Sequence, residues 1–285
     1  MQFNAPTPLD YFASLVADDR SLHLLEAAVS LGQDEDPHLD VQAVLARVDE
    51  LGDRLRARIT PDTVPAERLR LLTQLFHGEL GFAGNLNNYY AAENSFVHEV
   101  LRTRRGIPIT LAVLLLELAE HAGLRASGVA FPGHFLFKCR MGLGEVVIDP
   151  FTGQAMSATR LDELLAVYRH GSELPADLEL PLEFFLRAAS ARQILARMLR
   201  NLKEVHRATG DWPRLLAVQQ RLVVLLPGDA AERRDRGLVL DVLGHRAAAA
   251  DDLAYYLAGQ VDAPDAAKLR QRLAELLQQR SPPLQ

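Results

Sequence analysis

The chain has 285 residues, enough for one large domain or two smaller ones, and its 48% hydrophobic and 24% charged residues allow an ordinary globular core. The net charge is −6 and the basic residues are spread along the chain, which argues against a nucleic-acid-binding surface. A single cysteine excludes an internal disulfide framework, and the nine histidines lack metal-site spacing, so neither a metal ion nor another cofactor is expected.

Membrane insertion is not expected either. The longest uncharged, largely apolar run covers only ten residues, 107–116, which is too short to cross a bilayer. The first residues have neither the basic segment nor the apolar segment of a signal peptide. Together with the single cysteine, which fits a reducing compartment, these features predict a cytoplasmic protein.

The first hundred residues predict helices. Apolar residues recur at helical spacing over residues 41–59, and a second such series begins at Leu69. Residues 81–95 are polar with interleaved aromatic residues, which predicts an ordered loop. Asn94 or Ser95 is expected to cap the helix that follows this loop.

The next predicted helix differs from these because it is apolar on nearly every side. Pro108 stands where the first helical residue should be, and Gly123 stands just past the end. A helix without a polar face is buried, so we expect it at the centre of the domain.

Strand patterns follow this helix. Three short runs, at residues 127–131, 134–140 and 145–148, have β-type composition, and residues 141–144 form a plausible tight connection between the last two. A helix start followed by a strand with histidine and a strand with aspartate is the layout of a papain-like nucleophile, base and orienting carboxylate.

The hairpin register places the histidine and the aspartate on one face. If the connection is tight, Lys138 pairs with Val147 and Leu136 pairs with Asp149. Because side chains alternate along a strand, His134 then shares the face of Asp149 as a diagonal neighbour within hydrogen-bonding reach. A slip of one residue would put the two side chains on opposite faces.

The residues after Pro181 predict helices again, with an internal repeat. Gly210 and Gly244 are 34 residues apart, and at the same spacing Leu222 falls on Tyr256. A 34-residue period of helix, glycine-containing turn and helix is typical of tetratricopeptide repeats. Only about two and a half such units fit between residues 186 and 277, so we expect them to dock on the first domain.

The candidate catalytic residues are His134 as general base, Asp149 as the group that orients it, and Thr110 as the only hydroxyl in the first turn of the central helix. Each has a structural alternative. The histidine and the aspartate can form a buried pair that serves the fold, and Asp-Pro commonly starts a turn. Thr110 can bond locally to the backbone, and Cys139 alternates onto the face away from the histidine, as expected of a small core residue.

A groove around these residues would have further members. Gly133 allows close approach of the backbone, and Arg104 and Arg105 could clamp a carboxylate or phosphate near the positive end of the central helix. The two arginines could equally be solvated or pair with Glu93 and Glu99. The candidate groove residues are Asn94, Arg105, Pro108 and Gly133.

These segments resemble the bacterial SirB1 family, described as a transglutaminase-like domain followed by tetratricopeptide repeats. The similarity covers about residues 9–275 and is most specific in Arg-Arg-Gly-Ile-Pro-Ile at 104–109 and Pro-Gly-His-Phe at 132–135. Further matching runs are 88–90, 93–95, 99–101, 128–129 and 148–151. The resemblance implies a papain-like α+β domain with a small antiparallel sheet over residues 1–180, and an all-α tetratricopeptide-like region over 181–285 docked on it.

The resemblance also implies an incomplete catalytic triad. The transglutaminase-like core has Gly-x-Cys at the start of its central helix, and placed without gaps Gly106 takes the motif glycine while the cysteine position falls on Pro108. His134 and Asp149 match the histidine and the aspartate of the motif. Proline has no nucleophilic atom, so cysteine acyl transfer is not expected.

Three functions are compatible with these features. The first is a non-catalytic transglutaminase-like protein that binds a peptide or protein partner through its groove and its repeats, with a regulatory role suggested by the family's name. The second is a hydrolase or acyl transferase in which His134 and Asp149 activate Thr110 or a water. The third is a structural adaptor that does not use the groove. The sequence does not specify the oligomeric state.

Overall fold

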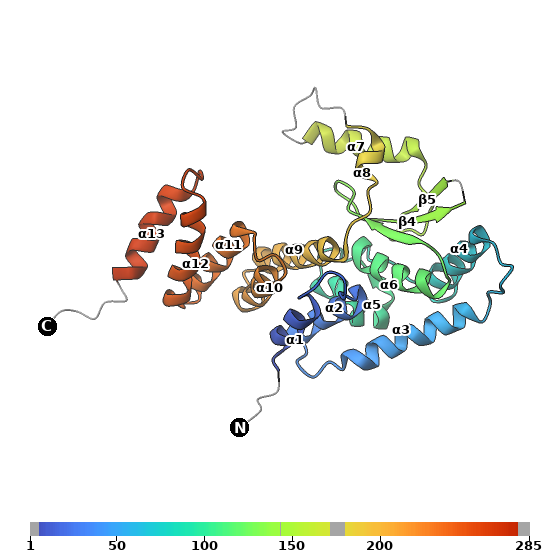
Figure 1. Cartoon of the computed structure of the whole chain (residues 1–285), viewed down its shortest axis with the longest axis horizontal. Coiled ribbons are helices and arrows are strands. Elements are labelled where there is room, and N and C mark those ends of the chain that lie inside the picture. The colour runs from blue at the N-terminus through green and yellow to red at the C-terminus, as the bar shows by residue number, and fades with distance from the viewer. Residues whose placement is uncertain (1–5, 143, 172–179, 279–285) are drawn as a thin grey trace. The chain divides into compact units, whose positions relative to one another are not determined.

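The computed structural model describes residues 6–142, 144–171 and 180–278 of the chain (Figure 1). Contacts group the chain into two compact units, one from Asp18 to Met198 and the other joining the residues up to Ala17 with those from Leu199 onward. The division falls within helix α9 (Ala191–Thr209). The predicted domain ranges, 1–180 and 181–285, and the predicted docking of the repeats stay predictions.

The unit of residues 18–198 is built around the buried helix α6 (Pro108–His121). Ten of its 14 residues are buried, as its uniformly apolar composition predicted. Pro108 lies in the first turn, and Gly123 follows the end of the helix with a φ of 67°. The helices that contact α6 are α2 (Leu24–Ser30), α3 (Val41–Arg56), α4 (Pro65–Thr73) and α5 (Val97–Thr103).

A three-stranded antiparallel sheet packs on α6. Its strands, in spatial order, are β3 (Ala126–Val129), β4 (Leu136–Met141) and β5 (Gly144–Ile148). Lys138 pairs with Val147, which confirms the predicted hairpin register. The predicted start of the second strand was wrong by two residues, because His134 lies in the turn before Leu136. Leu143, in the predicted connection, lies outside the described residues.

The segment between α4 and α5 departs from the predicted helix and loop. A π-helical turn, Gln74–Glu79, extends α4, and the two-residue strand β1 (Ala83–Gly84) pairs in parallel with β2 (Arg105–Gly106). The sequence did not indicate this pairing, because strands of two residues carry no periodic signal. The remaining short elements of this unit are 3₁₀ turns at Leu31–Asp34 and Ala92–Ser95 and helices α7 (Ala158–Gly171) and α8 (Leu182–Phe185).

Asn94 organises the loop before α5 instead of capping that helix. The N-cap of α5 is Phe96, without a side-chain hydrogen bond, so the predicted capping by Asn94 or Ser95 was wrong. The buried Asn94 amide donates to the carbonyl oxygens of Asn88 and Tyr89, at 2.6 and 3.0 Å. The Asn94 side chain therefore supplies donors to backbone carbonyl oxygens of this loop, beside the Ala91 N–H that also donates to Asn88.

The second unit is helical and repeats with the predicted period. Its helices are α9 from Leu199 onward, α10 (Trp212–Leu225), α11 (Ala230–Val242), α12 (Arg246–Gly259) and α13 (Ala266–Gln278). The starts of α10 and α12 are 34 residues apart, and Gly210 and Gly244 before them are both left-handed, with φ of 68° and 79°. The repeated conformation confirms the tetratricopeptide-like period.

The N-terminal helix α1 (Pro8–Leu15) belongs to this same unit and packs against α10. Thr7 and Asp10 form a capping box at its start. Its buried Phe12 ring lies 4.9 Å from the Arg221 guanidinium carbon. The Arg221 charge is deeply buried, and this contact with the ring face stabilises it. Helix α1 therefore supplies a partner for a charged side chain in the core of the repeat unit.

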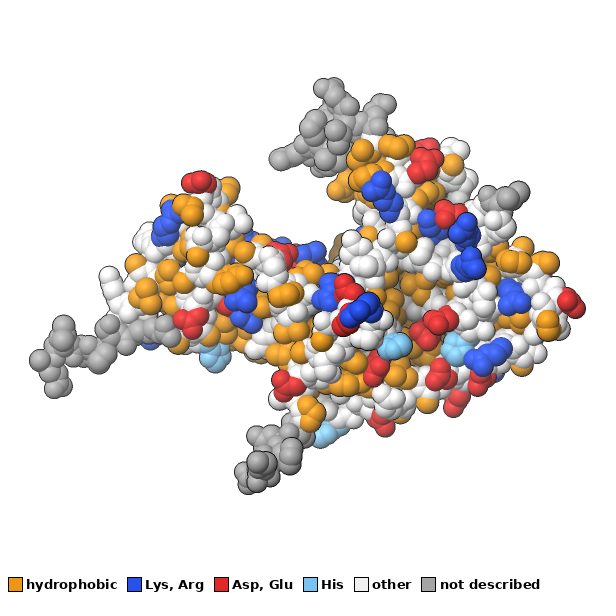
Figure 2. All heavy atoms as spheres, in the orientation of Figure 1, with side chains coloured by type: hydrophobic (Ala, Val, Ile, Leu, Met, Phe, Trp, Pro, Cys, Tyr) orange, Lys and Arg blue, Asp and Glu red, His pale blue; other side chains and the backbone are white. Residues whose placement is uncertain are grey.

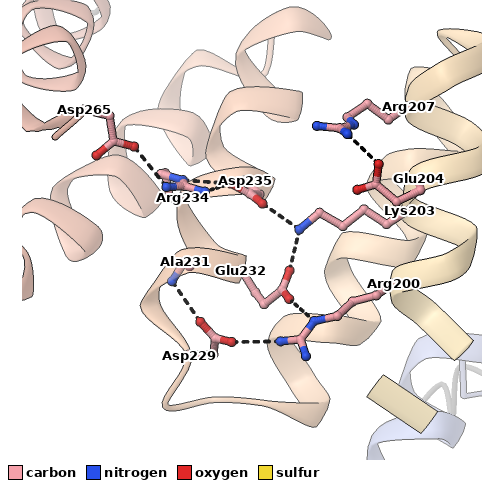
Figure 3. A network of polar contacts seen from close by, with 10 residues as sticks. All are labelled: Arg200, Lys203, Glu204, Arg207, Asp229, Ala231, Glu232, Arg234, Asp235 and Asp265. Carbon is pink, nitrogen blue, oxygen red and sulfur yellow. Dashed lines mark hydrogen bonds and ion pairs between the residues drawn. The ribbon is translucent and has the colours of Figure 1, made fainter. Parts of the chain in front are cut away.

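Ion pairs join helices α9 and α11 of the repeat unit, as Figure 3 shows. Lys203 on α9 donates to Glu232 and Asp235 on α11, at 2.8 and 2.6 Å, and Arg200 donates to Glu232 at 2.9 Å. The Glu232 side chain is only 5% exposed. A buried carboxylate requires such partners, so the network fixes α11 against α9.

The charges at the surface are mixed. On the face drawn in Figure 2, acidic and basic side chains are interspersed rather than gathered by sign. Across the described ranges, no helix combines the length and the apolar character needed to cross a membrane.

We expect Glu232→Gln to lower the free energy of unfolding by about 2 kcal/mol, because it removes the buried carboxylate that Lys203 and Arg200 share and leaves each with a single, more exposed acidic partner. Glu204→Gln is the matched control: its pair with Arg207 lies within one helix and is exposed, so the loss should be about 0.5 kcal/mol or less. Urea unfolding of both variants measures the difference. Equal losses would contradict a role of the network in holding the helices together.

Candidate functional site

A tight turn between β3 and β4 presents the His134 imidazole. The His134 N–H donates to the Phe131 carbonyl oxygen at 3.1 Å, and Gly133 between them has a φ of 67°. No atom lies within 4 Å of the place that a Cβ of residue 133 would take. Gly133 is therefore required by its left-handed backbone and not by the close approach that the sequence suggested.

Arg197 on α9 holds the same turn from another direction. Its Nη1 donates to the Phe131 carbonyl oxygen at 3.1 Å, and its guanidinium lies 5.7 Å from the Phe135 ring centroid. Burial lowers the pKa of Arg197, and the nearby Tyr89 partly offsets this effect. One carbonyl oxygen thus accepts from both the histidine backbone and an arginine, which restricts the position of the imidazole.

His134 and Asp149 form a direct hydrogen bond, as the register predicted. The His134 Nε2 lies 3.0 Å from Asp149 Oδ1, and the two side chains are 24% and 12% exposed. An ionised carboxylate only accepts hydrogen bonds, so Nε2 carries the hydrogen. In the neutral imidazole, Nδ1 is then the basic nitrogen, free to accept a proton or a hydrogen bond.

Asp149 is held by three donors. Besides His134, the Phe151 N–H donates to Oδ1 at 2.8 Å and the Thr152 hydroxyl donates to Oδ2 at 3.0 Å. Burial by itself would raise the pKa of Asp149, but the hydrogen bonds from His134, Phe151 and Thr152 outweigh it and hold the pKa below its ordinary value. The carboxylate is therefore a fixed negative charge beneath the imidazole.

The loop that carries Asp149 is anchored to the first half of the unit. The Gly84 N–H donates to the Phe151 carbonyl oxygen at 2.9 Å, and a Cβ on Gly84 would lie 2.2 Å from the Phe151 ring. Burial lowers the pKa of His77 in the π-helical turn, and the hydrogen bond to Phe82 and the nearby Asp149 carboxylate offset this only in part. His77 Nδ1 donates to the Phe82 carbonyl oxygen at 2.9 Å, and its buried Nε2 has no partner among the described residues.

A pocket of about 660 Å³ opens beside the His134–Asp149 pair. The polar residues of its lining include Gly133, His134, Asp149 and Thr152, and the apolar residues include Met156 with Leu164, Val167 and Tyr168 of α7. A partly exposed imidazole beside an apolar wall is the arrangement of a site that binds an apolar group and fixes it with a few polar contacts. We name this cavity the histidine pocket.

The candidate nucleophiles do not reach the histidine pocket. Thr110 is completely buried, its hydroxyl oxygen has no hydrogen-bond partner, and neither Thr110 nor Pro108 lines the pocket. The expected local bond from Thr110 to the backbone is therefore wrong. Cys139 is also completely buried, facing away in the middle of β4, and burial raises its pKa to about 11. Pro108 further removes one N–H from the helix start where an oxyanion would bind.

Arg105, another candidate groove residue, donates hydrogen bonds to backbone carbonyl oxygens. Arg105 Nη1 donates to the Gly81 and Arg104 carbonyl oxygens, at 2.7 and 2.9 Å. The Arg104 guanidinium lies over the Phe82 ring at 4.5 Å, and burial lowers its pKa. The predicted alternative, pairing of these arginines with Glu93 and Glu99, was wrong for Glu99, which pairs with Arg102. The roles assigned to Arg105, Asn94 and the other site residues stay predictions.

Comparisons with known proteins agree with this architecture. Residues 42–200 match the transglutaminase-like superfamily model and residues 202–274 match a tetratricopeptide repeat model. The UPF0162 protein of Xylella fastidiosa (strain 9a5c) is 35% identical over 241 residues, which cover 84% of this chain and 85% of that protein. The chain belongs to the UPF0162 family.

Two other members of the UPF0162 family also match most of the chain. The protein PM0557 of Pasteurella multocida is 31% identical over 80% of this chain and 85% of its own length. The protein YchA of Escherichia coli (strain K12) is 28% identical over 78% of this chain and 79% of its own length. No solved structure matches the chain. These matches confirm the predicted resemblance, a transglutaminase-like domain followed by tetratricopeptide repeats.

Sequence reasoning missed three contributors to the site. Arg197 and His77 are far from His134 in sequence, and no local pattern links them to it. The apolar wall formed by α7 had a weak signal, because Val167 and Tyr168 stand next to each other at positions that a soluble helix would expose. In the described parts of the chain, no three His, Cys, Asp or Glu side chains come close enough together to hold a metal ion.

The depressed pKa of Asp149 predicts a pH-dependent contribution to stability. Its stabilising effect is present above the ordinary pKa of 3.8 and is lost as pH falls through the lower folded-state pKa. We expect Asp149→Asn to unfold at a lower urea concentration than the wild type at about pH 7, with the difference shrinking below about pH 4. Asp62→Asn, at an exposed position, is the control. A difference that stays constant with pH would contradict the role of the ionised carboxylate.

Proposed function

We propose that this UPF0162 family member is a transglutaminase-like binding protein that holds a peptide segment of a partner in the histidine pocket and does not perform cysteine acyl transfer. The observation that carries the proposal is an oriented imidazole that opens to a pocket while the one thiol lies buried elsewhere. Thiolate chemistry requires an accessible, low-pKa sulfur, and Cys139 has the opposite properties.

The lining of the histidine pocket specifies the ligand. The apolar residues Met156, Leu164 and Val167 favour an apolar side chain, because their burial removes hydrocarbon from water. The free Nδ1 of His134 accepts one hydrogen bond, which a main-chain N–H of an extended peptide supplies. This pairing of one apolar contact with one polar contact suits an extended peptide.

The repeats extend this proposal to a protein partner. Tetratricopeptide repeats generally mediate contacts between proteins. The proposal therefore includes a cytoplasmic, regulatory role in which the partner is recognised by both units. The single cysteine is consistent with a reducing compartment.

Val167→Glu tests the peptide site. Val167 is 75% exposed, so the substitution places a charge on the pocket wall without disturbing the core. The probes are peptides that bind the wild-type chain, selected from an array of ten-residue peptides with a varied central residue. We expect these peptides to bind the variant at least about tenfold more weakly. Val64→Glu, at a site 60% exposed and outside the pocket, should bind as the wild type does. Equal binding by both variants would refute the histidine pocket as the peptide site.

The hydrolase remains the second candidate because the His134–Asp149 hydrogen bond is also the geometry of a general base. Its test is turnover of a panel of peptide, ester and amide substrates by the wild type and by His134→Ala. We expect the wild type to show no turnover beyond that of His134→Ala. Turnover that disappears in this variant, with peptide binding unchanged, would establish a water-activating enzyme and overturn the binding-only proposal.

A further inference from the structure

The repeat unit contains a second cavity, of about 520 Å³, bounded by α9, α10 and α11. Its lining includes Lys203, Arg207, Trp212, Gln219, Leu238 and Val242. We name it the repeat pocket. All of its lining residues belong to the unit that contains Leu199 and the residues after it.

Gln219 is an unsatisfied polar group in the lining of the repeat pocket. Its side chain is only 1% exposed, and its amide oxygen has no hydrogen-bond partner in the part of the chain that the structure describes. A buried acceptor without a donor destabilises the protein and is uncommon in native structures. A ligand N–H that enters the cavity would satisfy it.

Three large apolar side chains are exposed around the same cavity. Trp212, Leu238 and Val242 are 37%, 39% and 58% exposed, and all three line the repeat pocket. Single exposed apolar residues are ordinary, but three around one concave site form a surface that gains from being covered. A tryptophan at the edge of a cavity is also a frequent anchor of peptide interfaces.

The charges around the repeat pocket favour an acidic occupant. Lys203 and Arg234 are held by Asp235 and, for Arg234, by Asp265 as well. Among the described residues Arg207 pairs with Glu204, on its own helix, and both side chains are mostly exposed. Such a pair contributes little, so the Arg207 guanidinium can turn to a ligand carboxylate at small cost.

We infer that the repeat pocket binds an extended segment of a partner protein in which a large apolar residue stands next to Asp or Glu. The apolar side chain packs against Trp212 and Val242, a main-chain N–H donates to the Gln219 amide oxygen, and the acidic side chain pairs with Arg207. This inference rests on the proposed partner-binding role of the repeats and assigns to it a site and a peptide chemistry.

The experiment uses the full chain and an array of ten-residue peptides. In one set Leu or Phe is fixed next to Asp or Glu, and in the matched set Lys replaces the acidic residue. We expect the acidic set to bind preferentially, with affinity falling about tenfold in Val242→Glu and in Trp212→Ala. Arg207→Gln should weaken binding and reduce its dependence on salt, because the ion pair is exposed to screening.

Two further variants test the role of Gln219 and separate the repeat pocket from the histidine pocket. Gln219→Leu removes the buried acceptor and should weaken peptide binding without lowering the thermal midpoint, since it replaces an unsatisfied polar group with an apolar one. Val167→Glu, in the histidine pocket, should leave the preference for the acidic set over the lysine set unchanged, because the two sets share the same Leu or Phe. This inference and the proposed peptide site can therefore fail separately.

Equal binding of the two peptide sets, or equal binding by the wild type and Val242→Glu, would overturn the inference. Self-association of the chain that Val242→Glu abolishes, without binding of the acidic peptides, would assign the repeat pocket to a second copy of the chain and would also overturn it.

Discussion

The carboxylate of Asp149 is the point on which the candidate site depends. It accepts hydrogen bonds from an imidazole, a backbone N–H and a hydroxyl, and each comes from a differently placed residue: His134 in the turn before β4, and Phe151 and Thr152 in the loop after β5. A half-buried negative charge without these donors would take up a proton or move toward solvent. With them, the carboxylate stays ionised and fixes which imidazole nitrogen carries the hydrogen.

The supports of this pair come from the whole of the first unit. Arg197 on α9 holds the carbonyl of Phe131, and the β1 backbone at Gly84 holds the carbonyl of Phe151. Such support is what an active site or a precise binding site needs, because small displacements of a polar group weaken its interactions strongly. The missing part is the nucleophile: helix α6 begins with a proline and buries its only first-turn hydroxyl, Thr110. The unit thus retains an oriented base beside a pocket whose apolar wall suits recognition.

The repeat unit is held together in a different way. Its helices are partly polar, and ion pairs between α9 and α11 and between α11 and the residues before α13 supplement the apolar core. Helix α1 adds Phe12 to this unit from the other end of the chain. Because arrays of two or three repeats have little core of their own, these additional contacts account for how so short an array is held together.

The sequence by itself determined the features that local pattern encodes. These are the buried central helix, the hairpin register that brings His134 to Asp149, the 34-residue period and the absence of a cysteine at the start of α6. Each follows from side-chain spacing within one or two adjacent elements. Only the tertiary structure decided that Asn94 organises a loop instead of capping a helix, that Thr110 and Cys139 are buried away from the imidazole, and that Arg197, His77 and α7 complete the site. Those outcomes depend on contacts between residues far apart in the chain, where burial and competition for hydrogen-bond partners select among local alternatives that the sequence pattern leaves equal.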